Sequence, residues 1–311
     1  MVRRLNDLIY RRAVDSLIAR YRIQALVATF VTSPPMAQTP SILDLGDDNP
    51  AYWLERSLVP EYAAEIRRNE DLWANKSRYI VCVSSVLRER CARERGYPES
   101  KLYVIPNGVD LDIYRPPVDQ ASVKEALGLD PHMRYVGVIG SVNKMREVDR
   151  ILAVGQRLQH YPKVRLLVVG RGDGIEQLRQ QARVRNIDLD IAGFHTGDRL
   201  LKFYQSVDVG LCPYTITAGS NAICPMRLLH HSAVGATVVS TALEEVRRME
   251  FANVMISESD HEESFAEKVV SALDRSPGFR PVQVAKYDAG KLAARYRSLI
   301  EDVERQTNPS C

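Results

Sequence analysis

Short apolar segments alternate with amphipathic helical segments along almost the whole chain, and this alternation restricts the fold more than any other feature. Tyr135–Ile139 and Val164–Val169, for example, have the length and apolar character of buried strands, and a helical pattern follows each of them. Strands that alternate with helices in this way pair in parallel, because the helices serve as crossovers between neighbouring strands. We therefore predict an α/β chain built on parallel sheets.

Chain length and a pair of consecutive prolines at positions 116 and 117 predict two domains. A chain of 311 residues has the length of about two domains. Residues 134–285 offer about six strands with crossover helices, enough for a complete, doubly wound, Rossmann-like domain. Residues 1–116 offer fewer strands and form a partial domain of the same kind. Residues 117–133 are the expected linker, and residues 286–311 are expected to form a helix that crosses back to the first domain.

The boundary between the two domains carries a distinctive motif. The run Val104–Asp110 ends an apolar strand candidate, and its Asn107-Gly108 pair adopts positive φ at low cost. Followed by Tyr114 and Pro116, this run resembles the signature of the family 4 retaining glycosyltransferases, also called group 1, which have the GT-B fold with two Rossmann-like domains. The resemblance extends over most of the chain. It implies transfer of a sugar from a nucleotide-diphosphate sugar.

The same resemblance implies that the first domain is shortened. Family members have a fuller first domain, and the segment Asp44–Asp48 resembles one that lies in its second half. The chain is therefore expected to start inside that domain. Three explanations stay open: a truncated gene, a missing sheet supplied by a partner protein, or a domain that is natively small. Asp47 or Asp48 is expected to orient a hydroxyl of the acceptor, or else to cap the turn that follows.

Three segments of the second domain resemble the donor-binding core of the family, namely Asp208–Tyr214, Pro225–Leu229 and Ala233–Thr241. Between the first two, a polar loop leads into the start of a helix. Such a loop presents free backbone N–H groups and the positive end of the helix dipole, which suit a diphosphate. The donor-binding candidates in this region are Gly219, Ser220, Asn221 and Arg227.

The turn after the first strand of the second domain resembles the other half of the donor site. Gly140 matches the glycine of the family, and Ser141 stands where the family often has arginine. The lysine of the family is matched by Arg146, with Lys144 as the close alternative. Cations at a glycine turn suit a diphosphate, because they stabilise the charge that builds on the leaving phosphate. Arg146 is therefore the candidate catalytic residue.

His230 is the clearest departure from the family pattern. The resemblance implies a glutamate here, five residues before Gly235, that binds the ribose hydroxyls of the donor. A second glutamate of many members falls on Ala222. A neutral histidine makes one hydrogen bond to a hydroxyl, whereas a carboxylate accepts two. The donor is therefore expected to bind more weakly, with altered specificity, or not at all.

Three further motifs are expected to carry no chemistry. Gly170–Gly174 lacks the glycine spacing of a dinucleotide-binding turn, and we interpret it as a strand–helix turn. The Asp-x-Asp sequences Asp110–Asp112 and Asp188–Asp190 resemble the metal-binding pair of GT-A enzymes but stand in another context. Because GT-B enzymes generally need no metal, the resemblance implies neither a metal site nor a cofactor.

Charge and cysteine content narrow the partners and the compartment. Lys and Arg (42) nearly balance Asp and Glu (39), which disfavours a nucleic-acid partner. Five scattered cysteines without a Cys-x-x-Cys pair favour a reducing cytosol. The basic segment Met1–Arg22 has a helical pattern with an apolar face. It packs on a sheet with its arginines in solvent, which we favour, or it lies on an anionic membrane at the inner face.

The sequence thus predicts a cytoplasmic, metal-independent, retaining GT-B glycosyltransferase. Its substrates would be a nucleotide-diphosphate sugar and a glycan or lipid-linked acceptor. The alternative is a degenerate, non-catalytic glycosyltransferase-like protein, or a partner subunit of a split enzyme. The small first domain and the histidine at position 230 motivate this alternative.

Overall fold

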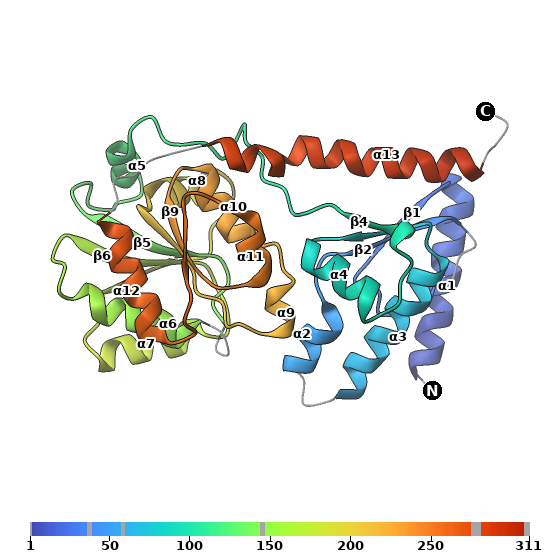
Figure 1. Cartoon of the computed structure of the whole chain (residues 1–311), viewed down its shortest axis with the longest axis horizontal. Coiled ribbons are helices and arrows are strands. Elements are labelled where there is room, and N and C mark those ends of the chain that lie inside the picture. Colours follow the sequence, from blue (N-terminus) through green and yellow to red (C-terminus); the bar gives the residue numbers. More distant parts are fainter. Residues whose placement is uncertain (1, 36–38, 57–59, 144–146, 275–280, 308–311) are drawn as a thin grey trace. The chain divides into compact units, whose positions relative to one another are not determined.

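The computed structural model describes residues 2–35, 39–56, 60–143, 147–274 and 281–307. The chain divides into two compact units, whose elements are labelled in Figure 1. Each unit combines segments that are far apart in the sequence. The smaller unit contains Met1–Pro106, Asn221–Cys224 and Lys291–Cys311, and the larger unit contains Asn107–Ser220 and Pro225–Gly290.

The smaller unit is built on a parallel sheet of four strands in the order β1-β2-β3-β4. Parallel strands place their carboxyl ends on one edge of the sheet, and Asp47 and Asp48 follow β2 at that edge. The strands are β1 (Leu26–Thr29), β2 (Ser41–Leu45), β3 (Tyr79–Cys82) and β4 (Leu102–Val104). The helices are α1 (Val2–Tyr21), α2 (Asn49–Arg56), α3 (Pro60–Lys76), α4 (Ser85–Arg93) and α13 (Ala289–Thr307), with a 3-10 turn at Glu99–Lys101.

Helix α13 supplies part of the core of the smaller unit. Ile42, Val81 and Ile105 form a buried cluster with Leu292 and Val303 of α13. Helices α3 and α4 pack against β2 and β3. Burial of apolar side chains stabilises by about 25 cal/mol per Å² of area removed from water, so the last helix is an integral part of this unit.

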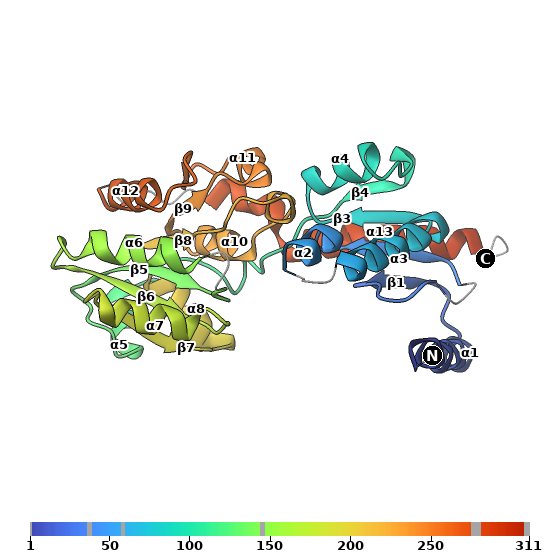
Figure 2. The ribbon, with the colours of Figure 1, turned by 90° about the horizontal axis from the view of Figure 1, so that it is seen from below.

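Strand β1 forms one edge of this sheet, and apolar side chains near it are exposed. Val27 is 45% exposed, and Phe30, which follows the strand, is 65% exposed. Leu17 and Tyr21 of α1 are 49% and 63% exposed, and α1 lies apart from α3 and α13 (Figure 2). Leu17 and Tyr21 are therefore not buried against a sheet as the prediction for the apolar face of α1 requires, whereas Val14 and Ile18 of the same face are half-buried. Within the described residues, no helix combines the length and apolar character that a membrane span requires.

The larger unit is built on a parallel sheet of six strands in the order β10-β9-β8-β5-β6-β7. Adjacent strands pair in parallel throughout, with a register shift between β6 and β7. The strands are β5 (Arg134–Ile139), β6 (Val164–Val169), β7 (Leu189–Gly193), β8 (Val209–Cys212), β9 (Thr237–Thr241) and β10 (Val254–Ser257).

Alternation along the strands gives this sheet two apolar faces. Val136 and Val138 of β5 belong to a buried cluster with α6, α7 and α12, whereas Tyr135 and Ile139 belong to a second cluster with α8. Helices therefore cover both faces, as in a doubly wound fold. The helices are α5 (Gln120–Ala126), α6 (Val148–Leu158), α7 (Ile175–Val184), α8 (Gly197–Ser206), α9 (Ala218–Asn221), α10 (Met226–Ala233), α11 (Glu244–Met249) and α12 (Glu262–Leu273), with a 3-10 segment at Pro281–Tyr287.

Two parallel sheets confirm the predicted α/β class. The sequence pattern does not predict helices α2 and α5, and α5 lies inside the segment 117–133 that is expected to be a linker. These helices contain 8 and 7 residues, too few to show a clear apolar period.

Candidate functional site

The strand order of the larger sheet reverses between β5 and β8. From β5 the chain moves outward through β6 to β7, then returns to β8 on the other side of β5 and continues to β9 and β10. In open parallel sheets, ligands bind beyond the carboxyl ends of the strands at such a reversal. The described residues that follow β5 and β8 at this point are 140–143 and 213–225, which contain or adjoin the predicted donor-binding residues.

Arg227, near the start of α10, ties these two loops together. Its guanidinium and the carboxylate of Glu147 form a buried pair, with Nη1 to Oε1 at 3.2 Å and Nη2 to Oε2 at 3.4 Å. Nε donates to the carbonyl of Ile139 (2.8 Å) and Nη2 to the carbonyl of Ser141 (2.7 Å). Burial disfavours the charge, but Glu147 raises the pKa of Arg227 above its ordinary value, so the guanidinium stays ionised. Arg227 is therefore committed to holding the loop after β5.

Gly140 and Ser141 directly follow β5, at the point where the strand order reverses. Gly140 has φ of +125°, a conformation that side-chain-bearing residues rarely adopt. Ser141 is exposed directly after it. The other two candidates on this loop, Lys144 and the candidate catalytic residue Arg146, lie outside the described residues.

The loop after β8 closes on itself through Ser220. The Ser220 hydroxyl donates to the carbonyl of Thr215 (2.6 Å) and accepts from the amide of Thr217 (2.8 Å). The amide of Ser220 donates to Oγ1 of Thr217 (3.1 Å). Ser220 and Gly219 are both buried. Asn221 is grouped with the smaller unit, together with Ala222. Ser220 is thus engaged in shaping the loop.

His230 of α10 stacks on an aromatic ring from the segment before α5. Its ring lies 4.2 Å from the Tyr114 ring, centroid to centroid, with 21° between the planes. Burial lowers the pKa of His230 to about 4, so the imidazole is neutral near pH 7. A neutral imidazole in this stack keeps the capacity for a single hydrogen bond to a ligand hydroxyl.

His231, the next residue, has a different environment. It is fully buried against Gly210 of β8, where an added Cβ would lie 2.3 Å from Cγ of the imidazole. Neither ring nitrogen has a hydrogen-bond partner among the described residues. Burial, followed by the charge of Arg227, lowers the pKa of His231 to about 3. Adjacent positions on a helix face different directions, which separates these two histidines.

Because His231 is buried, we expect acid to lower the free energy of unfolding of the larger unit. An unfolded chain takes up the imidazole proton near pH 6.5, whereas the folded chain resists it until about pH 3. Stability therefore falls as pH drops below about 6.5, by about 2 kcal/mol between pH 7.5 and pH 5. Urea unfolding at both pH values checks this. In His231→Leu the loss is expected to shrink by that amount, and equal losses in parent and variant would contradict it.

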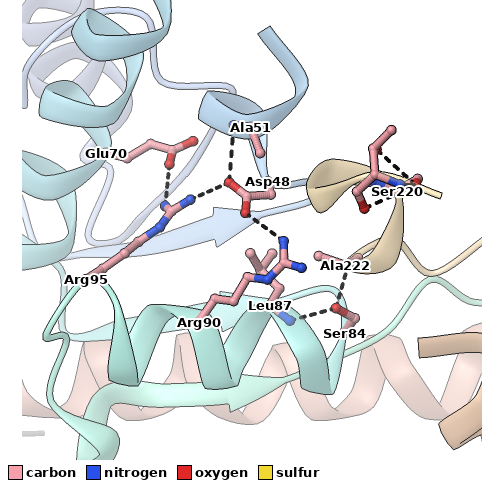
Figure 3. Close-up of polar contacts among 10 residues, drawn as sticks. Asp48, Ala51, Glu70, Ser84, Leu87, Arg90, Arg95, Ser220 and Ala222 are labelled. Carbon is pink, nitrogen blue, oxygen red and sulfur yellow. Dashed lines mark hydrogen bonds and ion pairs between the residues drawn. The ribbon is translucent and has the colours of Figure 1, made fainter. Parts of the chain in front are cut away.

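Asp48 lies in a buried charged network of the smaller unit (Figure 3). Arg95 bridges Asp48 and Glu70, with 2.6 Å between the paired atoms in both cases. Arg90 reaches the second oxygen of Asp48 at 3.4 Å. The Asp48 carboxylate also accepts from the amide of Ala51 in the first turn of α2, at 3.5 Å. The network therefore fixes the loop after β2 and engages Asp48, whereas Asp47 beside it is half-buried.

The candidate donor site of the larger unit includes residues that the sequence motifs did not assign to it. These are Glu147, Tyr114 and the glycines of the Gly170–Gly174 turn. Tyr114 belongs to the domain-boundary motif, which was a usable signal, whereas nothing in the sequence marks Glu147. Among the described residues, no group of three or more His, Cys, Asp and Glu side chains is arranged to hold a metal ion.

Comparison with known proteins follows the same division of the chain. Residues 133–275 match the family model "Glycosyl transferases group 1", and residues 3–113 match the model "Glycosyltransferase Family 4". A D-inositol 3-phosphate glycosyltransferase of Xylanimonas cellulosilytica is 27% identical over 253 residues, which cover 77% of this chain and 57% of that protein. The chain spans less than two thirds of the length of the first curated relatives that it matches.

Solved structures share the fold at low sequence identity. Sucrose-phosphate synthase from Thermosynechococcus elongatus has a TM-score of 0.77 at 13% identity, over 94% of this chain and 77% of that one. HepE of Anabaena, solved in complex with UDP, has a TM-score of 0.72 at 14% identity, over 93% of this chain and 81% of that one. With both family models matched and the fold shared, the chain belongs to the group 1, family 4 glycosyltransferases of the GT-B fold.

Proposed function

We propose that this protein transfers a sugar from a nucleotide-diphosphate sugar to a glycan or lipid-linked acceptor, with retention of configuration and without a metal or other cofactor. The observation that carries the proposal is the pair of loops braced by Arg227 where the strand order reverses, between β5 and β8. HepE, which shares this fold, is a UDP complex. In the transfer, the bond from the anomeric carbon to the phosphate oxygen breaks and the acceptor oxygen bonds to the same face of the sugar. The acceptor proton leaves with the nucleotide phosphate.

The proposed roles follow the two units. The larger unit binds the donor: Gly140, Ser141 and the loop containing Gly219, Ser220 and Asn221 surround the diphosphate. His230 lies near the ribose, and Arg227 holds the loop in place. Arg146, with Lys144 beside it in the sequence, is proposed to stabilise the charge on the leaving phosphate. Asp47 of the smaller unit, ahead of Asp48, orients the acceptor.

Thermal unfolding in the presence of UDP, GDP and ADP tests the donor site. A ligand at a hundred times its dissociation constant stabilises the folded state by about 2.7 kcal/mol, which gives a clear shift in Tm. We expect one nucleotide to raise Tm, with and without EDTA, and the corresponding nucleotide sugar to give a product of retained configuration by proton NMR. No shift with any nucleotide, in a sample that unfolds cooperatively, would reject the proposal.

A second candidate function is that of a non-catalytic subunit. One observation in its favour is His230 at the position of a family glutamate. The other is the edge strand β1, which offers its backbone to a partner strand and has the exposed side chains of Val27 and Phe30 beside it. For residues 1–22, the other proposal is peripheral contact with the inner face of the membrane. We place the protein in the cytoplasm.

Changing His230 separates the two candidates. His230→Glu restores two acceptors for the ribose, and a decayed donor site would regain about tenfold in nucleotide affinity. His230→Gln, which is neutral, is the control. Turnover by the parent chain and no gain in His230→Glu would show that His230 serves a working enzyme in another way.

A further inference from the structure

The Gly170–Gly174 turn after β6 packs directly against the candidate diphosphate loop after β5. A Cβ added at Gly170 would lie 1.9 Å from the carbonyl oxygen of Gly140, and one at Gly172 would lie 2.0 Å from the carbonyl oxygen of Val142. Both distances are far below any real contact between such atoms. Both glycines also have positive φ, at +150° and +148°. The two backbones therefore approach as closely as they do only because side chains are absent.

Hydrogen bonds continue the pairing of β5 and β6 into these loops. The amide of Gly140 donates to the carbonyl of Val169 (2.8 Å), and the amide of Val142 donates to the carbonyl of Arg171 (3.0 Å). The amide of Gly174 returns a bond to the carbonyl of Val142 (3.1 Å). Gly140 and Val142 thus direct both of their backbone groups toward the turn after β6.

The residues that alternate with them, Ile139 and Ser141, must direct their backbone groups to the opposite side. In an extended parallel pairing, alternate residues direct their backbone groups to opposite neighbours. The carbonyls of Ile139 and Ser141 do point to the opposite side, where Arg227 binds both of them, at 2.8 Å and 2.7 Å. The amide N–H of Ser141 shares that side, which is the side of β8 and of the strand-order reversal. No described group accepts a hydrogen bond from this amide, and Ser141 is exposed.

We propose that the Ser141 amide is a hydrogen-bond donor to a phosphate of the nucleotide, and that Gly170, Gly172 and Arg227 are positioning residues for it. This inference rests on the proposed function. A backbone N–H aimed at a phosphate before the ligand arrives costs no reorganisation on binding. The turn after β6, which lacks a dinucleotide fingerprint, would thus act on phosphate binding through the neighbouring loop.

Single-atom changes test the positioning role. Gly172→Ala and Gly170→Ala force the loops apart by the volume of one methyl group, and loss of a hydrogen bond to a charged group costs about tenfold or more in affinity. We expect UDP to bind about tenfold more weakly or worse to each variant. Binding of uridine, which has no phosphate, is expected to be unchanged. General loss of structure would weaken both ligands, so the ratio of the two dissociation constants, measured by NMR titration, is the readout.

A matched control belongs to this experiment. Gly128→Ala introduces a side chain at φ of +75°, with no atom within 4 Å of the added Cβ, so it carries the backbone strain without the contact. This variant is expected to retain the parent ratio. A parent-like ratio in folded Gly170→Ala and Gly172→Ala would overturn the positioning role.

An amide-detected titration of the isotopically labelled parent keeps the inference testable if the glycine variants do not fold. UDP is expected to shift the Ser141 amide resonance strongly and uridine to leave it in place. An amide that responds to neither ligand, while UDP binds, would overturn the proposal. A parent that binds none of UDP, GDP and ADP would instead reject the proposed function, and this inference with it.

Discussion

Replacing Arg227 by methionine is expected to lower the free energy of unfolding of the larger unit by about 3–5 kcal/mol. The variant leaves the Glu147 carboxylate buried without its partner, and it removes the donors to the carbonyls of Ile139 and Ser141. Methionine keeps much of the side-chain volume, so the loss reports charge and hydrogen bonding rather than a cavity. Urea unfolding followed by far-UV circular dichroism measures it.

The two tryptophans of the chain allow the units to be observed separately. Trp53 and Trp73 both lie in the smaller unit, so tryptophan fluorescence reports that unit. Arg227→Met is expected to move the dichroism transition and to leave the fluorescence transition in place. In the double variant Arg227→Met/Glu147→Leu no buried charge remains, and at least half of the lost stability should return. A double variant no more stable than Arg227→Met would contradict the account of the pair.

Replacing Arg95 by methionine is expected to have an effect of similar size, about 3–5 kcal/mol, on the smaller unit. Arg95 is the partner of two buried carboxylates, those of Asp48 and Glu70. Burial already raises the pKa of Glu70, and the charge of Arg95 opposes this. Without Arg95 the pKa of Glu70 rises further, so the variant should regain part of its stability as pH falls toward that pKa. Tryptophan fluorescence at pH 7.5 and 5.5 measures both effects.

Arg88 of α4 provides the control for Arg95. It pairs with Glu99 at 3.1 Å, but the Glu99 side chain is 75% exposed. Solvent-exposed pairs contribute about 0–1 kcal/mol, so Arg88→Met is expected to change stability little. Similar losses in Arg88→Met and Arg95→Met would show that burial of the network does not matter.

Sequence reasoning predicted the fold because each strand carries its own signal. Val164–Val169 is read as a buried strand from its own residues, and its helix follows at a fixed distance. The sequence pattern did not reveal helices α2 and α5 because 8 and 7 residues are too few to show a clear apolar period. Asp119 caps α5 by accepting from the amides of Ala121 and Ser122, a signal that was available in the segment treated as linker.

Site prediction was limited by contacts that the strand order creates. Motifs placed Gly140 and Ser141 in the turn after a strand and Arg227 near the start of a helix, because glycine turns and helix starts are local features. The pairing of Arg227 with Glu147 depends on β8 lying beside β5, which no local pattern encodes. The same holds for the stack of Tyr114 on His230.

Helix α13 has a consequence for synthesis on the ribosome. The strands of the smaller unit emerge first, but the apolar cluster around Ile42 and Val81 stays open until Leu292 and Val303 leave the exit tunnel. By that time residues 107–290, which hold the larger unit, have all been made. Nascent chains cut or stalled before Ala289 would therefore carry an uncovered sheet, a species prone to aggregation and in need of chaperones.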